Sequence, residues 1–256
     1  MSAVKHNIWD NPDRWVALGL SQVLAILVIS IATVTLGDSV LAVMMLDVKS
    51  QQFVYPFNIH NFLHLLFFLG MGDLYVRWRC SSREKSFLKM NLLPEDAATV
   101  LQPQDMPPIR QKVATLHHAD TGILPYLVDI GILQFLASKS VDQTVKVIDS
   151  SLELIAHRVE LKYTFCRYLA WAIPTIGFIG TVLHISRALQ QINPETPDLG
   201  LLTATLGVAF YTTLVALVES ALLVFGLQII EAKEELALND AGQYIMKNLI
   251  NRLYAG

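Results

Sequence analysis

The sequence has few charged residues for its length. Only 16% of its 256 residues are Asp, Glu, Lys or Arg, while 53% are hydrophobic and the mean hydropathy is +0.45. A soluble domain carries about 25% charged residues, so this composition indicates a helical membrane protein with several spans and a modest polar portion. The formal net charge is −3, so the sequence lacks the excess of basic residues that nucleic-acid-binding proteins carry.

Cysteine is also scarce. Cys80 and Cys166 are the two cysteines, and both lie beside basic residues at the ends of apolar runs. Their spacing fits neither a disulfide framework nor a metal site, so we predict two reduced, structural thiols. The sequence shows no internal repeat. Its first apolar run is too long for a cleavable signal peptide, and no clean small-residue cleavage site follows it.

Four apolar runs are long enough to cross a bilayer as helices. They cover residues 16–36, 57–76, about 168–189 and about 201–230. Gly37 and Asp38 mark the end of the first. The densest basic cluster, residues 77–85, follows the second run, and the positive-inside rule places it in the cytoplasm. The sequence therefore predicts four transmembrane helices with both termini in the cytoplasm.

The last two runs each carry small, hydroxyl-bearing and ionisable residues on one helical face. These faces, here called the two stripes, are Pro174, Gly177, Thr181, His184 and Ala188 on the first, and Thr205, Ala209, Thr212, Ala216 and Glu219 on the second. Steps of three and four residues place each set on one side of a helix. Small residues allow close packing of membrane helices, and hydroxyls can line a polar cavity, so both interpretations stay open. Glu219 favours the second, because a deep carboxylate in a span usually has a function or a buried partner.

The role of Glu219 has several alternatives. It is either a proton way-station, a contact for a basic residue on the cytoplasmic side, or a protonated side chain bonded to a backbone carbonyl group. His60 and His64, one turn apart in the second run, are either a metal pair, a proton relay or interfacial histidines; we favour the interfacial interpretation because no further ligand has matching spacing. His117 and His118 are adjacent and cannot share a helical face, so we expect a surface loop.

The predicted domains follow the spans. They are a cytoplasmic N-terminus (1–15), two peripheral transmembrane helices (16–76), a cytoplasmic insertion (77–165), two pore-lining transmembrane helices (166–230) and a cytoplasmic C-terminal helix (231–256). The first half of the insertion is predicted to be loop-like because it contains Pro94, Pro103, Pro107 and Pro108. The second half is predicted to be a helix, because apolar residues recur at helical spacing from Val141 to Val159.

A short motif in the last two runs resembles a known family. The outgoing run contains Pro174, Gly177, Gly180, Thr181 and Val182, and the returning run contains Thr203, Ala204, Thr205 and Gly207. This pattern, within residues 140–235, is similar to that of the MotA/TolQ/ExbB proton-channel family. The four-span layout resembles the MotA branch, while the glycine–threonine motif looks more like TolQ and ExbB.

The resemblance implies an all-α, ring-forming subunit of a bacterial inner-membrane ion channel, not an enzyme, with no cofactor beyond the transported proton. Five copies would surround a dimer of a MotB/TolR/ExbD-like protein that has a single span and an aspartate within it, and the connection between the first two spans would be periplasmic. Proton flow would drive rotation or force on envelope machinery. Thr181 matches the family's pore threonine. On the returning span, the position of the family's threonine is occupied by Ala204, with a threonine on either side. Thr203 and Thr205 are therefore both candidates for the residue that faces the partner, and the stripe favours Thr205.

We therefore predict an ion pathway lined by Thr181, Thr205, Thr212, Glu219 and His184, and a helix-packing motif of Pro174, Gly177, Gly180 and Gly207. No metal site is predicted. The alternatives are a small secondary transporter or channel with its own solute site, a membrane metal enzyme that uses His60, His64, His117 and His118, and a scaffold of the same fold that conducts nothing. The chain is short and has no inverted repeat, which argues against a transporter.

Overall fold

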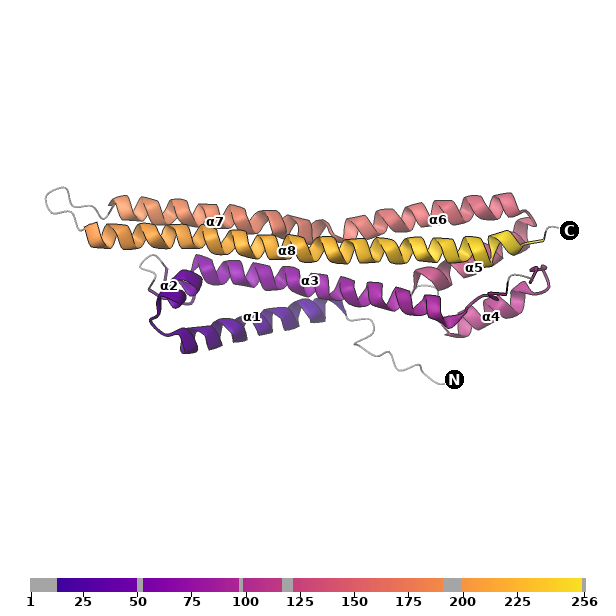
Figure 1. Ribbon diagram of the computed structural model, residues 1–256, viewed down its shortest axis with the longest axis horizontal. Helices are drawn as coiled ribbons and strands as arrows, with labels where there is room; N and C mark the ends of the chain where they lie inside the picture. The colour runs from indigo at the N-terminus through magenta and orange to yellow at the C-terminus, as the bar shows by residue number, and fades with distance from the viewer. Residues whose placement is uncertain (1–12, 50–52, 97–98, 117–121, 191–198, 255–256) are drawn as a thin grey trace. The chain divides into compact units, whose positions relative to one another are not determined.

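The structure is a computed structural model, and it describes residues 13–49, 53–96, 99–116, 122–190 and 199–254. These residues form an all-helical fold (Figure 1). The helices are α1 (Arg14–Leu36), α2 (Val40–Leu46), α3 (Ile59–Phe87), α4 (Met106–Leu116), α5 (Ile123–Ser138), α6 (Val141–Lys162), α7 (Thr164–Gln190) and α8 (Leu199–Asn248). Short 3-10 turns cover Leu88–Met90 and Ile250–Arg252, and one parallel bridge joins Leu101 and Leu253.

The chain divides into two compact units. Among the described residues, the membrane unit comprises those within 13–76 and 164–229, and the insertion unit comprises those within 77–163 and 230–254. Helices α3 and α8 contribute residues to both. Four stretches of helix are long and apolar enough to cross a membrane, within 14–36, 59–90, 141–190 and 202–252. The prediction of an all-helical fold with four candidate spans is confirmed, while the ring and its copy number stay predictions.

The insertion unit is built around α5. Its buried side chains include Leu127, Val128 and Ile132, and they pack with residues of α4, α6 and the end of α8 in one apolar core. Beyond the core, the Tyr163 hydroxyl, between α6 and α7, donates to Glu234 of α8 over 2.6 Å. Burial, followed by that hydrogen bond, raises the pKa of the Tyr163 hydroxyl, which therefore stays a donor.

The loop-like first half predicted for the insertion is wrong in two places. Helix α3 continues through the basic cluster to Phe87, and Pro107 and Pro108 lie in the first turn of α4, where a missing N–H group costs no helical hydrogen bond. Helix α5 lies in the second half, before the predicted helix from Val141, and the sequence pattern did not identify it as a separate element. The predicted helix from Val141 is confirmed as α6, whose first turn is capped by Ser140.

In the membrane unit, α1 and α3 differ sharply in burial. The large apolar side chains of α1 are mostly exposed, and its buried residues are Ala17, Leu18 and Ala25. Gly37 ends α1 with φ = 52°, a left-handed conformation that favours glycine, as the sequence indicated. A surface of Val, Leu and Ile on a candidate span is what contact with lipid requires.

Helix α3 packs against both α1 and α8 within the membrane unit, and its peripheral position in an assembled channel stays a prediction. A Cβ atom on Gly70 would lie 2.7 Å from Leu223 of α8, and one on Gly72 would lie 2.5 Å from the hydroxyl oxygen of Ser21 of α1. Asp73, fully buried, forms a 2.7 Å ion pair with Arg14 of α1. Two polar residues of this run, His64 and Asp73, thus contact other helices of the same chain.

Pro174 lies within α7 and removes one backbone donor. The carbonyl oxygen four residues earlier, that of Ala170, would otherwise accept from the N–H group of residue 174. The hydroxyl of Ser220, on α8, donates to this oxygen over 2.7 Å. Ser220 is buried, so the hydrogen bond that the proline removes is replaced from the neighbouring helix.

We expect Ser220→Ala to lower the free energy of unfolding by about 1 to 3 kcal/mol, because the Ala170 carbonyl group would be buried without a donor. Thermal unfolding of the purified protein in detergent measures this. Ser30→Ala is the control, since that hydroxyl is exposed on α1 and bonds within its own helix to Ile26. Equal unfolding temperatures for the two variants would contradict the role of Ser220.

Candidate functional site

Helices α7 and α8 lie side by side in the membrane unit (Figure 1). All residues of the two stripes are buried or half-buried. A Cβ atom on Gly177 would overlap the methyl carbon of Ala216. One on Gly180 would lie 2.6 Å from the methyl group of Thr212 and 3.1 Å from Ile59 of α3. Glycine is therefore required at both positions for α7 to approach α8 and α3 this closely.

Thr181 connects α7 to α8 through hydrogen bonds of its hydroxyl group. Its hydroxyl donates to the backbone oxygen of Ala209 over 2.8 Å and also meets the hydroxyl of Thr213. Thr213 in turn lies 3.4 Å from the backbone oxygen of Gly177. The two hydroxyls form a small polar site between two apolar helices, at the threonine that the family motif singles out. Sequence reasoning missed Thr213, because it falls one position beyond the second stripe.

The other predicted residues take different positions. Thr212 is fully buried and bonds within its own helix to Val208 over 3.0 Å. Thr205 is half-buried, whereas Thr203 is exposed. A Cβ atom on Gly207 would meet nothing within 4 Å among the described residues, so Gly207 makes no packing contact of the kind seen at Gly177. A pore lined by the stripes stays a prediction, and any path through Thr212 would run within one subunit.

Glu219 has a partner that the sequence did not suggest. Its Oε1 atom forms a short hydrogen bond with Nδ1 of His64 on α3, and both residues are buried. The other ring nitrogen of His64, Nε2, lies 2.8 Å from the backbone oxygen of Met45. A carbonyl oxygen only accepts, so Nε2 carries a hydrogen. One proton then remains to be shared between Nδ1 and the carboxyl group, and the pair is neutral overall.

This arrangement excludes one alternative for Glu219 and describes the two histidines. Glu219 contacts neither a basic residue near the cytoplasm nor, through Oε1, a backbone carbonyl group. His60 is fully buried and His64 is 8% exposed, so both side chains lie among the helices of the bundle. His60 is the second residue of α3, and its position near the membrane interface stays a prediction.

His184 lies near the start of α3 and the end of α2. Its Nε2 atom is 4.0 Å from a carboxylate oxygen of Asp47, the buried residue that ends α2. The side chain of Asn58 links the end of α2 to the start of α3. It donates to the backbone oxygen of Asp47 over 3.1 Å, and it accepts from the N–H group of Asn61, in the first turn of α3, over 2.9 Å.

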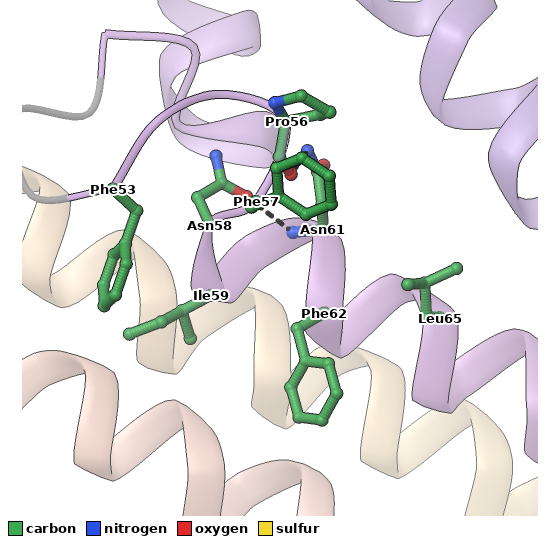
Figure 2. Close-up of a pocket in the computed structure, with 8 residues that line it drawn as sticks. All are labelled: Phe53, Pro56, Phe57, Asn58, Ile59, Asn61, Phe62 and Leu65. Carbon is green, nitrogen blue, oxygen red and sulfur yellow. Dashed lines mark hydrogen bonds between the residues drawn. The ribbon is translucent and has the colours of Figure 1, made fainter.

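Figure 2 shows Asn58 and Asn61 at this turn, beside an apolar groove lined by Phe53, Pro56, Phe57, Ile59, Phe62 and Leu65.

The metal interpretation gains no geometric support. Within the described ranges, no three His, Cys, Asp or Glu side chains are arranged to hold a metal ion. His117 and His118, which that interpretation also needs, lie outside the described residues, as do Glu195 and Asp198 in the connection from α7 to α8.

Comparison with known proteins gives one match. The profile of the MotA/TolQ/ExbB proton channel family matches residues 123–240, from the start of α5 to the second half of α8. Both stripes, the Thr181–Thr213 pair and Glu219 fall within this range. No curated protein and no solved structure matches the chain.

The matched family consists of multi-pass bacterial inner-membrane proteins that form proton channels with a stator-type function, and it is not a family of enzymes. Its members typically work with MotB, TolR or ExbD partners. Residues 123–240 of this chain are a domain of the MotA/TolQ/ExbB proton channel family.

Proposed function

We propose that the protein is the ion-conducting subunit of a proton-driven stator. Five copies assemble around a dimer of a single-span, MotB/TolR/ExbD-like partner whose span carries an aspartate. Proton flow through the assembly drives rotation or transmits force to machinery of the cell envelope. The insertion unit and both termini lie in the cytoplasm, on the side of the basic cluster at residues 77–85.

The observation that carries this proposal is the hydroxyl pair of Thr181 and Thr213 within the family domain. Thr181 is half-buried, so the residue is partly open to other chains while its hydroxyl bonds to Ala209 and Thr213 of α8. A hydroxyl both donates and accepts without carrying charge, and it can therefore hand a proton to or from a partner's carboxylate at little cost in the membrane. Thr205, also half-buried on α8, extends the path in this proposal.

The outer surfaces of α7 and α8 support the rotary part of the proposal. Phe178, Val182, Phe210 and Leu214 are each about half exposed or more. A ring in which an inner helix turns needs a smooth apolar lumen, because polar contacts would hold the rotor at fixed positions. In an assembled ring these side chains supply that surface, together with contacts to lipid and to neighbouring subunits.

The test is proton uptake by vesicles that contain the protein together with a co-expressed single-span partner. We expect Thr181→Ala to abolish partner-dependent uptake and Thr181→Ser to retain it, because serine keeps the hydroxyl. Thr175→Ala is the matched control, since the Thr175 hydroxyl on the same helix bonds only to the Trp171 backbone oxygen of its own turn, over 2.9 Å. Unfolding temperatures and subunit counts of all variants separate loss of conduction from loss of structure.

Other results would favour the other functions. Wild-type uptake in Thr181→Ala would contradict the role of Thr181. An assembled wild-type complex that takes up no protons would indicate a scaffold, and equal uptake with and without the partner would indicate a self-contained channel or transporter.

A further inference from the structure

Polar atoms buried without a hydrogen-bond partner gather in one part of the membrane unit. Within the described ranges they include both ring nitrogens of His60, Nε2 of His184, Oε2 of Glu219 and the side-chain oxygen of Asn61. These atoms come from α3, α7 and α8. Buried polar groups in native proteins are nearly always paired with protein or with ordered water, so a cluster of this kind calls for a function or for bridging water.

His60 lies between the other groups of the cluster. It is fully buried, and its neighbour Ile59 lies 3.1 Å from the place of a Cβ atom on Gly180, one turn before His184 on α7. His64 lies one turn further along α3 and shares a proton with Glu219, whereas His184 lies beside Asp47 at the end of α2. The rings therefore occupy neighbouring turns of α3 and α7, with His184 beside Asp47 on one side and the His64–Glu219 pair, which also meets Met45, on the other.

We propose that His184, His60, His64 and Glu219 form a proton relay inside each subunit, which carries a proton between the α2 end of the helix bundle and the carboxyl group of Glu219. The relay is separate from the Thr181–Thr213 pair and needs no partner chain. It uses the property of imidazole that one ring nitrogen accepts a proton while the other releases one.

Each step of the relay moves one proton from a named donor to a named acceptor. A proton that arrives from water at the α2 end binds His184, and His184 returns to its neutral form when the proton passes on to one nitrogen of His60. The opposite nitrogen of His60 then releases a proton, through bridging water, toward the His64–Glu219 pair. The pair takes up this proton on Oε2 of Glu219, which has no hydrogen-bond partner among the described residues, and it carries one extra positive charge until the same steps in reverse return a proton to water.

Other ionisable groups face this path. Asp47 stands beside His184 at the end of α2, and the charge of Arg187, one turn further along α7, also acts on His184. The ion pair of Asp73 with Arg14 lies more than two turns beyond His64 on α3 and is not part of the relay.

The first test examines the shared proton by infrared spectroscopy of the purified protein alone. In His64→Gln, Glu219 loses its partner and must take up the proton to stay neutral, so the carbonyl stretch of a protonated carboxyl group should appear. It should be absent from His64→Gln/Glu219→Gln. Identical spectra for these two variants would mean that Glu219 stays ionised without His64, which would overturn the shared-proton site.

The second test examines the relay. NMR of protein with isotope-labelled histidine follows replacement of the proton on His64 Nδ1 by deuterium after transfer to heavy water. His60→Phe should slow this exchange about 100-fold, the scale of proton transfer by a positioned side chain. His60→Gln keeps a polar side chain but has no ring, so it should also slow the exchange. This variant replaces His60→Phe in the test if His60→Phe does not fold. His157→Gln, at an exposed histidine of α6, is the control.

Exchange at the wild-type rate in a folded His60 variant would overturn the relay. Neither test involves a partner or ion flux, so their outcome is independent of whether the protein acts as a stator.

Discussion

His64→Leu should lower the free energy of unfolding by about 3 to 5 kcal/mol, the cost of breaking a buried charged pair by removing one partner. The variant leaves Glu219 buried without its partner, and the carboxyl group must take up a proton or remain charged in an apolar environment. Thermal or denaturant unfolding of the purified protein in detergent measures the loss.

The double variant His64→Leu/Glu219→Leu isolates the cause. Replacing both members of a buried pair by apolar side chains of similar size is often nearly neutral, so we expect the double variant to recover most of the lost stability. The lost hydrogen bond from His64 to the Met45 backbone oxygen is common to both variants and does not affect the comparison. His157→Leu, at an exposed histidine, should stay within about 0.5 kcal/mol of wild type. A double variant as unstable as His64→Leu would show that the pair is not the source of the loss.

The helical spans could be predicted from the sequence because their signals are local. Apolar length gave the four candidate spans, and Gly37 gave the end of α1. Proline gave a misleading signal at Pro107 and Pro108, since a proline in the first turn of a helix and one in a loop look alike in sequence. Helix α5 carried only a weak periodic signal, because its exposed face includes the apolar residues Leu133 and Ala137.

The candidate site was only partly accessible from sequence. Glu219 stood out as a deep carboxylate in a span, but its partner is 155 positions away in the chain, and no local pattern connects the two. His64 had a visible signal, the one-turn spacing from His60, but its interpretation depended on whether α3 is an inner or an outer helix. That property depends on which helices pack together, which the sequence pattern of one span does not contain.

Small residues illustrate the same limit. Gly177 and Gly207 belong to the same family motif and were predicted to play the same packing role. The structure separates them: Gly177 touches Ala216 across the helix pair, whereas Gly207 has open space where a side chain would begin. Which glycine is required is therefore a property of the register between α7 and α8, and it can be tested directly.

Gly177→Ala should destabilise the membrane unit by about 1 to 3 kcal/mol or more, because the added methyl group would overlap that of Ala216. The Cβ atom of Ala216 is fixed by its backbone and cannot rotate away, and the backbone oxygen of Thr212 lies 3.4 Å from the same position, so α7 must move away from α8. That movement would also lengthen the hydrogen bond from Thr181 to Ala209. We therefore expect the variant to have both a lower unfolding temperature and less partner-dependent proton uptake.

Gly207→Ala is the matched control for this prediction, since it makes the same chemical change on a helix of the same pair. Alanine is favoured over glycine in a helix by about 1 kcal/mol, and a Cβ atom at this position meets nothing within 4 Å. The single subunit should therefore be as stable as wild type or slightly more so. If instead Gly207→Ala lowers only the number of subunits in the assembled particle, Gly207 packs against a neighbouring copy. Equal unfolding temperatures for Gly177→Ala and Gly207→Ala would contradict the close contact between α7 and α8 on which the position of Thr181 depends.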